Sequence, residues 1–110
     1  MSFVYSTRFV DLAGVSGLYP DAYTVPLGQL AVVRTIIISL GSNITAGDAR
    51  VITGSGAVIA IHGEGIGPSG PTSTYFSGRT VVPPGDSLSL ETTGGYIADF
   101  TISGYLLALP

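Results

Sequence analysis

Few side chains in this sequence could carry out acid–base, nucleophilic or metal chemistry. The chain has a single histidine, His62, and it contains neither cysteine nor lysine. One histidine cannot supply the two or three imidazoles of a typical catalytic metal site, and without cysteine there are no thiolate clusters and no disulfides. A Ser-His-Asp triad would have to use His62, yet no Gly-x-Ser-x-Gly turn is present to expose a nucleophilic serine. We therefore expect His62 to end a β-strand with a hydrogen-bonded ring, and we predict no catalytic residue, no metal ligand and no cofactor.

The acidic side chains are spread along the chain. None has the Asp-x-Asp spacing of a calcium-binding loop, and the spacing in a β-rich sequence does not reveal two carboxylates facing each other across a glycosidase cleft. Asp48 follows Gly47 and Asp86 follows Gly85, which is typical of turns. We expect surface and turn positions for all seven carboxylates: Asp11, Asp21, Asp48, Glu64, Asp86, Glu91 and Asp99.

The composition is that of a chain with very little charge. Only 10% of the residues are charged and 45% are apolar, whereas an ordinary soluble domain has ~25% charged residues. The cations are four arginines that do not cluster, and the net charge is −3, so a nucleic-acid-binding surface is excluded. Either the surface is neutral and rich in hydroxyl groups, or apolar surface is covered by other copies or by partners. We favour the second interpretation.

The framework that must position these residues is a set of short β-strands. Runs of β-branched and aromatic residues alternate with Gly, Pro, Asn and Asp, and helix signals are almost missing. The pattern predicts one all-β domain over residues 1–110, an antiparallel β-sandwich of jelly-roll-like type with about eight strands. The expected strands are Phe3 to Val10, Tyr23 to Val25, Gln29 to Leu40, Arg50 to Thr53, Ala57 to His62, Thr74 to Val82, Ser87 to Thr92 and Tyr96 to Leu107.

Three local patterns refine this framework. Leu88 and Leu90 alternate with polar residues, which predicts that they face the core. Pro83-Pro84-Gly85-Asp86 predicts a turn, because proline fixes φ and glycine tolerates positive φ. The run from Val58 to Ile61 is apolar on both faces, which indicates either a central strand or a strand covered by another subunit.

Candidate contact residues lie in two exposed segments. The stretch between His62 and Ser73 has four glycines and two prolines in ten residues, which predicts a long exposed loop that either touches a partner or simply connects two strands. Its candidates are Glu64, Ile66, Pro68 and Pro71. The second segment is Tyr19-Pro20-Asp21-Ala22-Tyr23, in which we expect Tyr19 and Tyr23 to be exposed. With Tyr75, these tyrosines could alternatively stack on sugar rings.

Neither secretion nor membrane insertion is indicated. Met1 to Arg8 lacks a basic region followed by an apolar stretch, so we expect no signal peptide. The longest apolar run, Val32 to Leu40, is interrupted by Arg34 and falls short of the ~20 residues of a membrane-spanning helix. We expect a soluble protein, made in the cytoplasm and without a membrane partner.

Three segments resemble parts of small virion proteins of tailed bacteriophages, especially those of actinobacteria. Ser77 to Leu88 (SGRTVVPPGDSL) and Ser103 to Pro110 (SGYLLALP) look like the end of those proteins, and Val25 to Arg34 (VPLGQLAVVR) is similar to their entry into a long strand. The resemblance implies a non-enzymatic structural subunit located in the virion, decorating the capsid or forming part of the tail. The matching residues are folding residues, so no site residue is carried over.

Composition and resemblance together favour a capsid decoration protein. We expect it to assemble with itself as a small cyclic oligomer such as a trimer, and to contact other virion proteins such as the major capsid or tail proteins. The alternatives are a tail accessory protein and a carbohydrate-binding β-sandwich that contacts the host surface.

Overall fold

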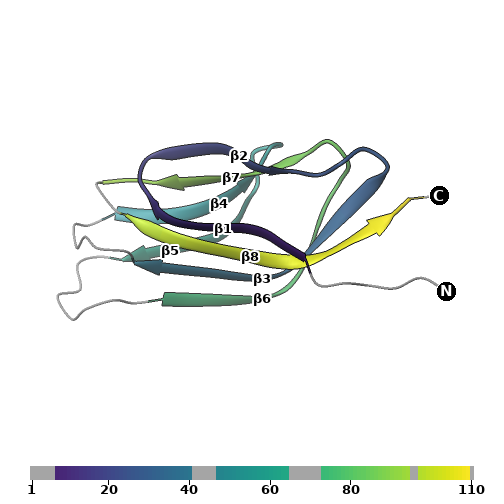
Figure 1. The fold of residues 1–110 in the computed structure, drawn as a ribbon. Helices are drawn as coiled ribbons and strands as arrows, with labels where there is room; N and C mark the ends of the chain where they lie inside the picture. Colours follow the sequence, from purple (N-terminus) through teal and green to yellow (C-terminus); the bar gives the residue numbers. More distant parts are fainter. Residues whose placement is uncertain (1–6, 41–46, 65–72, 95–96, 110) are drawn as a thin grey trace.

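The protein forms eight β-strands joined by turns and loops (Figure 1). A computed structural model describes residues 7–40, 47–64, 73–94 and 97–109. Within these ranges there is no helix long and apolar enough to cross a membrane. The strands are β1 (Thr7–Val15), β2 (Leu18–Thr24), β3 (Gln29–Leu40), β4 (Gly47–Thr53), β5 (Val58–Glu64), β6 (Ser73–Val82), β7 (Ser87–Thr92) and β8 (Ala98–Ala108).

The strands form two four-stranded sheets with the orders β1-β8-β3-β6 and β2-β7-β4-β5. All pairs are antiparallel, and the strand partners are nested about the middle of the chain: β4 pairs with β5, β3 with β6, β2 with β7 and β1 with β8. A long double hairpin rolled into two facing sheets is the jelly roll. The expected all-β, eight-stranded, jelly-roll-like sandwich is therefore confirmed.

The core is the space between the two sheets. Because side chains alternate across a strand, every second residue of the central strands points inward. Leu88 and Leu90 of β7 are fully buried, as predicted, and they face Phe100 and Ile102 of β8. The largest fully buried side chains come from both sheets: Phe100, Ile38, Leu88, Leu90, Ile102, Val25, Val51 and Val82.

The sheet around β3 contains a backbone irregularity at Arg34. Val33 pairs with Gly104 and Thr35 with Ser103, so Arg34 is an extra residue with no partner on β8. The backbone of β3 approaches β8 closely here, and a Cβ atom on Gly104 would overlap the carbonyl oxygen of Val32. Position 104 therefore has no room for a side chain, and only glycine fits there without moving the backbone.

The first two strands differ from the sequence prediction. The first strand continues to Val15, beyond the expected end at Val10, and Phe3 lies outside the described residues. The second strand is Leu18–Thr24 instead of the expected Tyr23 to Val25. Because β2 lies at the edge of its sheet, it can contain Pro20 and a bulge without breaking hydrogen bonds to a second neighbouring strand. The pairing register of β2 with β7 changes between Tyr19 and Tyr23, and Asp21, which lies in this interval, has a φ of 51°.

The position of β5 excludes one of the two alternatives for the run Val58 to Ile61. The central-strand alternative is wrong, since among the described residues β5 is the outer strand of its sheet and pairs only with β4. Val58 and Ile61 are about half exposed, whereas Ala60 is buried. The predicted turn is confirmed: Gly85 has φ 80°, and the Asp86 N–H donates to the Pro83 carbonyl at 3.1 Å.

Candidate functional site

Titratable side chains do not form a chemical centre in the described part of the chain. There, no three His, Cys, Asp or Glu side chains gather as metal ligands could. The clearest polar cluster joins β4 to the residue after β7: Arg50 donates to Asp48 from Nε (3.3 Å) and Nη2 (3.1 Å), and the Thr93 hydroxyl donates to Asp48 Oδ1 at 2.9 Å. The guanidinium of Arg50 lowers the pKa of Asp48 below its ordinary value. This cluster fixes a strand end to a turn, which is a structural role.

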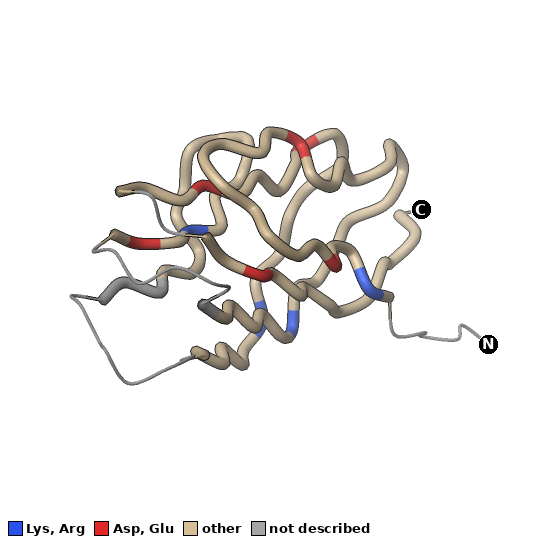
Figure 2. The backbone as a smooth tube through the Cα atoms, turned by 60° about the vertical axis from the view of Figure 1, so that its left-hand side comes forward, with Lys and Arg blue, Asp and Glu red and all other residues tan. Residues whose placement is uncertain are grey.

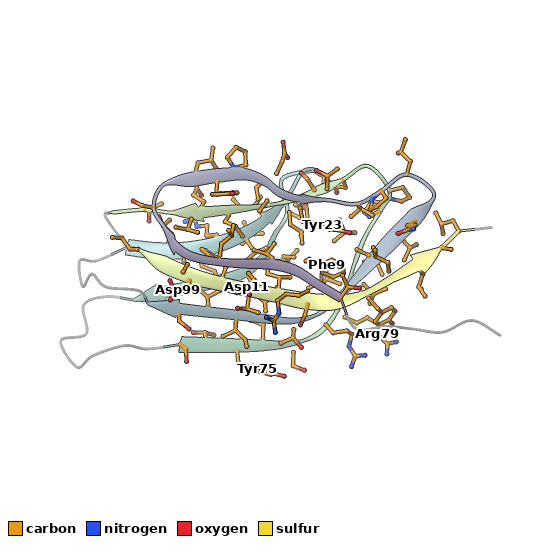
Figure 3. All side chains as sticks on the ribbon, viewed as in Figure 1. Phe9, Asp11, Tyr23, Tyr75, Arg79 and Asp99 are labelled. Carbon is orange, nitrogen blue, oxygen red and sulfur yellow. The ribbon has the colours of Figure 1, made fainter. Side chains whose placement is uncertain are left out.

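The predicted contact residues are distributed as follows. Tyr19 is exposed on β2, as expected, whereas Tyr23 is half-buried with its ring centroid 4.9 Å from that of Phe9 (Figure 3). The bulge in β2 turns Tyr23 inward, and burial raises the pKa of its phenol. Glu64 is the last residue of β5, and its side chain lies outside the description. Ile66, Pro68 and Pro71 lie outside the described residues, and the His62 side chain does as well.

One narrow side of the sandwich carries exposed apolar side chains. It is formed by the edge strands β5 and β6, which come together from the two sheets, and we call it the β5/β6 side. Tyr75 of β6 is 64% exposed, and Val58 and Ile61 of β5 are 49% and 47% exposed. Within the described residues, these strands have no further hydrogen-bonded neighbour, so both the edge and its apolar side chains are uncovered there.

An open cavity of about 150 Å³ lies on the same side, between residues of β3, β5 and β6. Ile59 of β5 and Phe76 of β6 line it from opposite sheets, together with residues of β3. Two arginines, Arg34 and Arg79, also line the cavity. Arg34 donates from Nε to the Gly78 carbonyl at 2.9 Å, whereas Arg79 has no hydrogen-bond or ion-pair partner among the described residues. The β5/β6 side thus combines apolar surface with positive charge.

The opposite narrow side is formed by β1 and β2, and we call it the β1/β2 side. Leu18 is 64% exposed beside the exposed Tyr19. The backbone N–H of Asp21 donates to the Ser89 hydroxyl at 3.0 Å, which anchors the bulge, and the Asp21 carboxylate has no partner among the residues described. Asp11 of β1 forms an exposed ion pair with Arg8. Because Arg8 balances Asp11, the negative charge of this side comes from Asp21. Figure 2 shows how few charged positions the chain has.

A further group of exposed apolar side chains lies at one end of the sandwich. Leu27, in the connection before β3, is 84% exposed, and Leu109 follows β8. The N–H of Leu109 donates to the Gly28 carbonyl at 2.8 Å, which holds these two segments together. Val81 of β6 and Leu107 of β8 are exposed on the two strands that flank β3 in the same sheet. We call this group the apolar end.

Sequence reasoning singled out Tyr19, Tyr75 and the run from Val58 to Ile61, but it did not single out Leu18 or Arg79. The run is apolar on both faces, and only the strand order excludes a central strand. No local pattern distinguished Arg79 from the other arginines. That Arg79 has no partner among the described residues depends on tertiary geometry, which periodicity does not encode.

Comparison with known proteins gives fold likeness only. No protein-family model matches the sequence, and no curated protein matches it significantly. A chain from the acidic stable capsid of Helicobacter pylori bacteriophage KHP30 is similar in structure, with a TM-score of 0.66 and 9% identity, over 99% of this chain and 94% of that chain. A chain of the VP2 subviral particle of infectious bursal disease virus was also found, with a TM-score of 0.43 and 12% identity, over 96% of this chain and 32% of that chain.

Proposed function

We propose that this protein is a non-enzymatic structural subunit of a phage virion, and specifically a capsid decoration protein. The main support is the jelly roll shared, over nearly the full length of both chains, with a chain from a bacteriophage capsid. The likeness covers 99% of this chain and 94% of that chain, so it involves the whole sandwich and not a few strands of it. The sequence resemblance to small virion proteins of tailed phages agrees with this role.

The surface supports an assembly role independently of the fold. Exposed large apolar side chains lie on both narrow sides and at the apolar end, while only 10% of residues are charged. A protein that functions alone in solution rarely exposes several apolar areas, because they promote association. Contacts with many neighbours in a symmetric particle would cover such areas.

The two alternatives differ from this proposal in location and ligand. A tail accessory protein would share the fold and the uncovered surfaces. A carbohydrate-binding module would need aromatic rings that act together, but Tyr19 and Tyr75 lie on opposite sides of the sandwich and Tyr23 is half-buried. The arrangement of the tyrosines therefore favours a structural subunit over sugar binding.

Fractionation of virions tests the proposal directly. Antibodies raised against the purified chain are applied to heads and tails separated from particles of the phage whose genome encodes it. The expected result is a strong signal in the head fraction, at a copy number comparable to that of the shell subunits. Absence from the virion would overturn the proposal, a signal confined to tails would replace it by the tail alternative, and glycan-array binding without virion incorporation would favour the carbohydrate-binding module.

A further inference from the structure

We infer that the protein assembles head to tail with copies of itself, the β5/β6 side of one copy packing against the β1/β2 side of the next. The inference deepens the proposed function and rests on it for its biological setting. The two sides lie at opposite edges of the sandwich, as the strand orders β1-β8-β3-β6 and β2-β7-β4-β5 require. One contact therefore leaves the other side of each copy available for a further neighbour.

Apolar surface is present on both sides of this junction. The β5/β6 side offers Tyr75, Val58 and Ile61, and the β1/β2 side offers Leu18 and Tyr19. Each set is exposed in the isolated chain, and burial of such side chains supplies the favourable free energy of association. The open cavity between Ile59 and Phe76 adds a concave element that a projecting side chain could fill.

Charge on the two sides is complementary. Arg79 and Arg34 lie on the β5/β6 side, and the Arg79 guanidinium has no partner among the described residues. Asp21 lies on the β1/β2 side, and its carboxylate likewise has no partner within the described ranges. Figure 3 labels Tyr75 and Arg79, which belong to β6, and Asp11, which belongs to β1 at the other edge of the same sheet and is paired with Arg8. A head-to-tail contact brings an unpartnered cation to an unpartnered carboxylate.

The same charges argue against a two-fold contact. In a two-fold dimer each side faces its own copy, so two β5/β6 sides would place arginines opposite arginines. Like charges at a partly desolvated contact raise the free energy of the complex. The heterologous arrangement avoids this and produces either a closed ring or an open filament, depending on the rotation between neighbours. A closed ring agrees with the expected cyclic oligomer.

The area of the proposed junction is comparable to that of a standard protein interface. Two edge strands about 10 Å apart, each up to ~30 Å long and with side chains projecting outward, give a strip of roughly 20 by 30 Å. Side-chain relief brings the accessible area of such a strip near the ~800 Å² per partner of a standard protein interface. The junction is therefore large enough for a stable contact.

A complementation experiment tests the polarity of the contact. One variant carries Ile61→Asp and Tyr75→Asp on the β5/β6 side, a second carries Leu18→Asp on the β1/β2 side, and Leu27→Asp at the apolar end is the control. Mass is measured by sedimentation and light scattering at two concentrations ten-fold apart, and the fold is checked by circular dichroism. We expect discrete oligomers for the wild type and for the control, and monomers for each variant alone.

An equimolar mixture of the two variants gives the decisive result. Each variant keeps one intact side, so the mixture should form a heterodimer that does not grow further. If the Leu18→Asp variant still dimerises alone, the contact is two-fold and the inference is overturned. A wild type that stays monomeric at the highest concentration also overturns it. Virion fractionation gives an independent answer, so a monomer that is nevertheless found in heads would leave the proposed function standing.

Single charge changes provide a second test that does not disturb packing. Arg79→Glu should dissociate the oligomer, because it places a carboxylate opposite Asp21. Asp21→Asn keeps a residue that tolerates φ 51° and should weaken association by about two- to five-fold, the range of an exposed ion pair. Adding salt should weaken the wild type more than the Asn variant. Unchanged association in both variants would contradict the charge pairing.

Discussion

Replacing Gly104 by alanine tests the close approach of β3 to β8. An added Cβ would overlap the Val32 carbonyl oxygen and would lie 2.9 Å from the Val32 carbonyl carbon and 3.0 Å from the Arg34 nitrogen. These are backbone atoms of the central strand pair, so relief requires moving a strand. Overpacking of this kind costs roughly 1–3 kcal/mol, and because backbone is involved we expect the upper part of that range, about 2–3 kcal/mol.

The size of this effect is measurable by thermal and urea unfolding. An unfolding entropy of ~2.1 cal/mol/K per residue gives about 4 °C per kcal/mol for a chain of this length, so Tm should fall by roughly 9–13 °C. Unfolding is followed by far-ultraviolet circular dichroism, at concentrations low enough for each variant to be monomeric. The urea m-value should stay unchanged, because the surface exposed on unfolding is nearly the same.

Gly78→Ala is the matched control. It introduces the same methyl group on β6, but a Cβ atom at Gly78 would meet nothing within 4 Å. Its φ lies outside the left-handed region, so the change should be neutral or stabilising by up to ~1 kcal/mol, since alanine restricts the unfolded chain. If Gly104→Ala is no less stable than Gly78→Ala, the steric account of the β3 irregularity is wrong.

Three further changes probe the core, a part-buried hydrogen bond and an ion pair. Phe100→Ala empties the centre of the sandwich and should cost ~3–5 kcal/mol in urea unfolding. Thr92→Val removes the hydroxyl that accepts the Gly17 N–H at 2.7 Å and should cost ~1–2 kcal/mol by the same assay; a loss below ~0.3 kcal/mol would contradict a role for that bond. The pKa of Asp48 is lowered in the folded state, so its contribution is present above the unfolded value of ~3.9 and is lost as the pH falls below it. Asp48→Asn should therefore reduce stability at pH 7 by less than ~1 kcal/mol and make acid unfolding less steep below pH ~4, as followed by circular dichroism.

The fold was largely predictable because the local patterns agree with the tertiary structure in most strands. β7 matches the predicted range Ser87 to Thr92 to the residue, since alternating leucines follow a proline-glycine turn. β2 was mispredicted because Pro20 and Asp21 indicate a turn, whereas the structure accommodates them in an edge-strand bulge. That bulge also reverses which face Tyr23 occupies, and so the expected exposure of Tyr23 was wrong while that of Tyr19 was right.

The candidate surfaces were less predictable than the fold. A run of apolar residues such as Val58 to Ile61 has the same sequence pattern at an edge and in the middle of a sheet, and only the strand order distinguishes them. The pairing of Arg79 on one side with Asp21 on the other depends on positions that lie far apart in the chain. The proposed contacts at Glu64, Ile66, Pro68 and Pro71 remain predictions.

The nested strand pairing also constrains how the chain reaches its native state. Among the paired strands of the described residues, only β4 and β5 follow each other directly in the chain, joined by Gly54 to Ala57, so their hairpin closes at the smallest entropic cost. Once this hairpin has formed, fewer flexible residues separate β3 from β6, so pairing these two strands costs less chain entropy. The same argument then applies to β2 with β7, and finally to β1 with β8. Because most contacts join residues distant in sequence, folding should take milliseconds to seconds, and the outermost pair should be completed last.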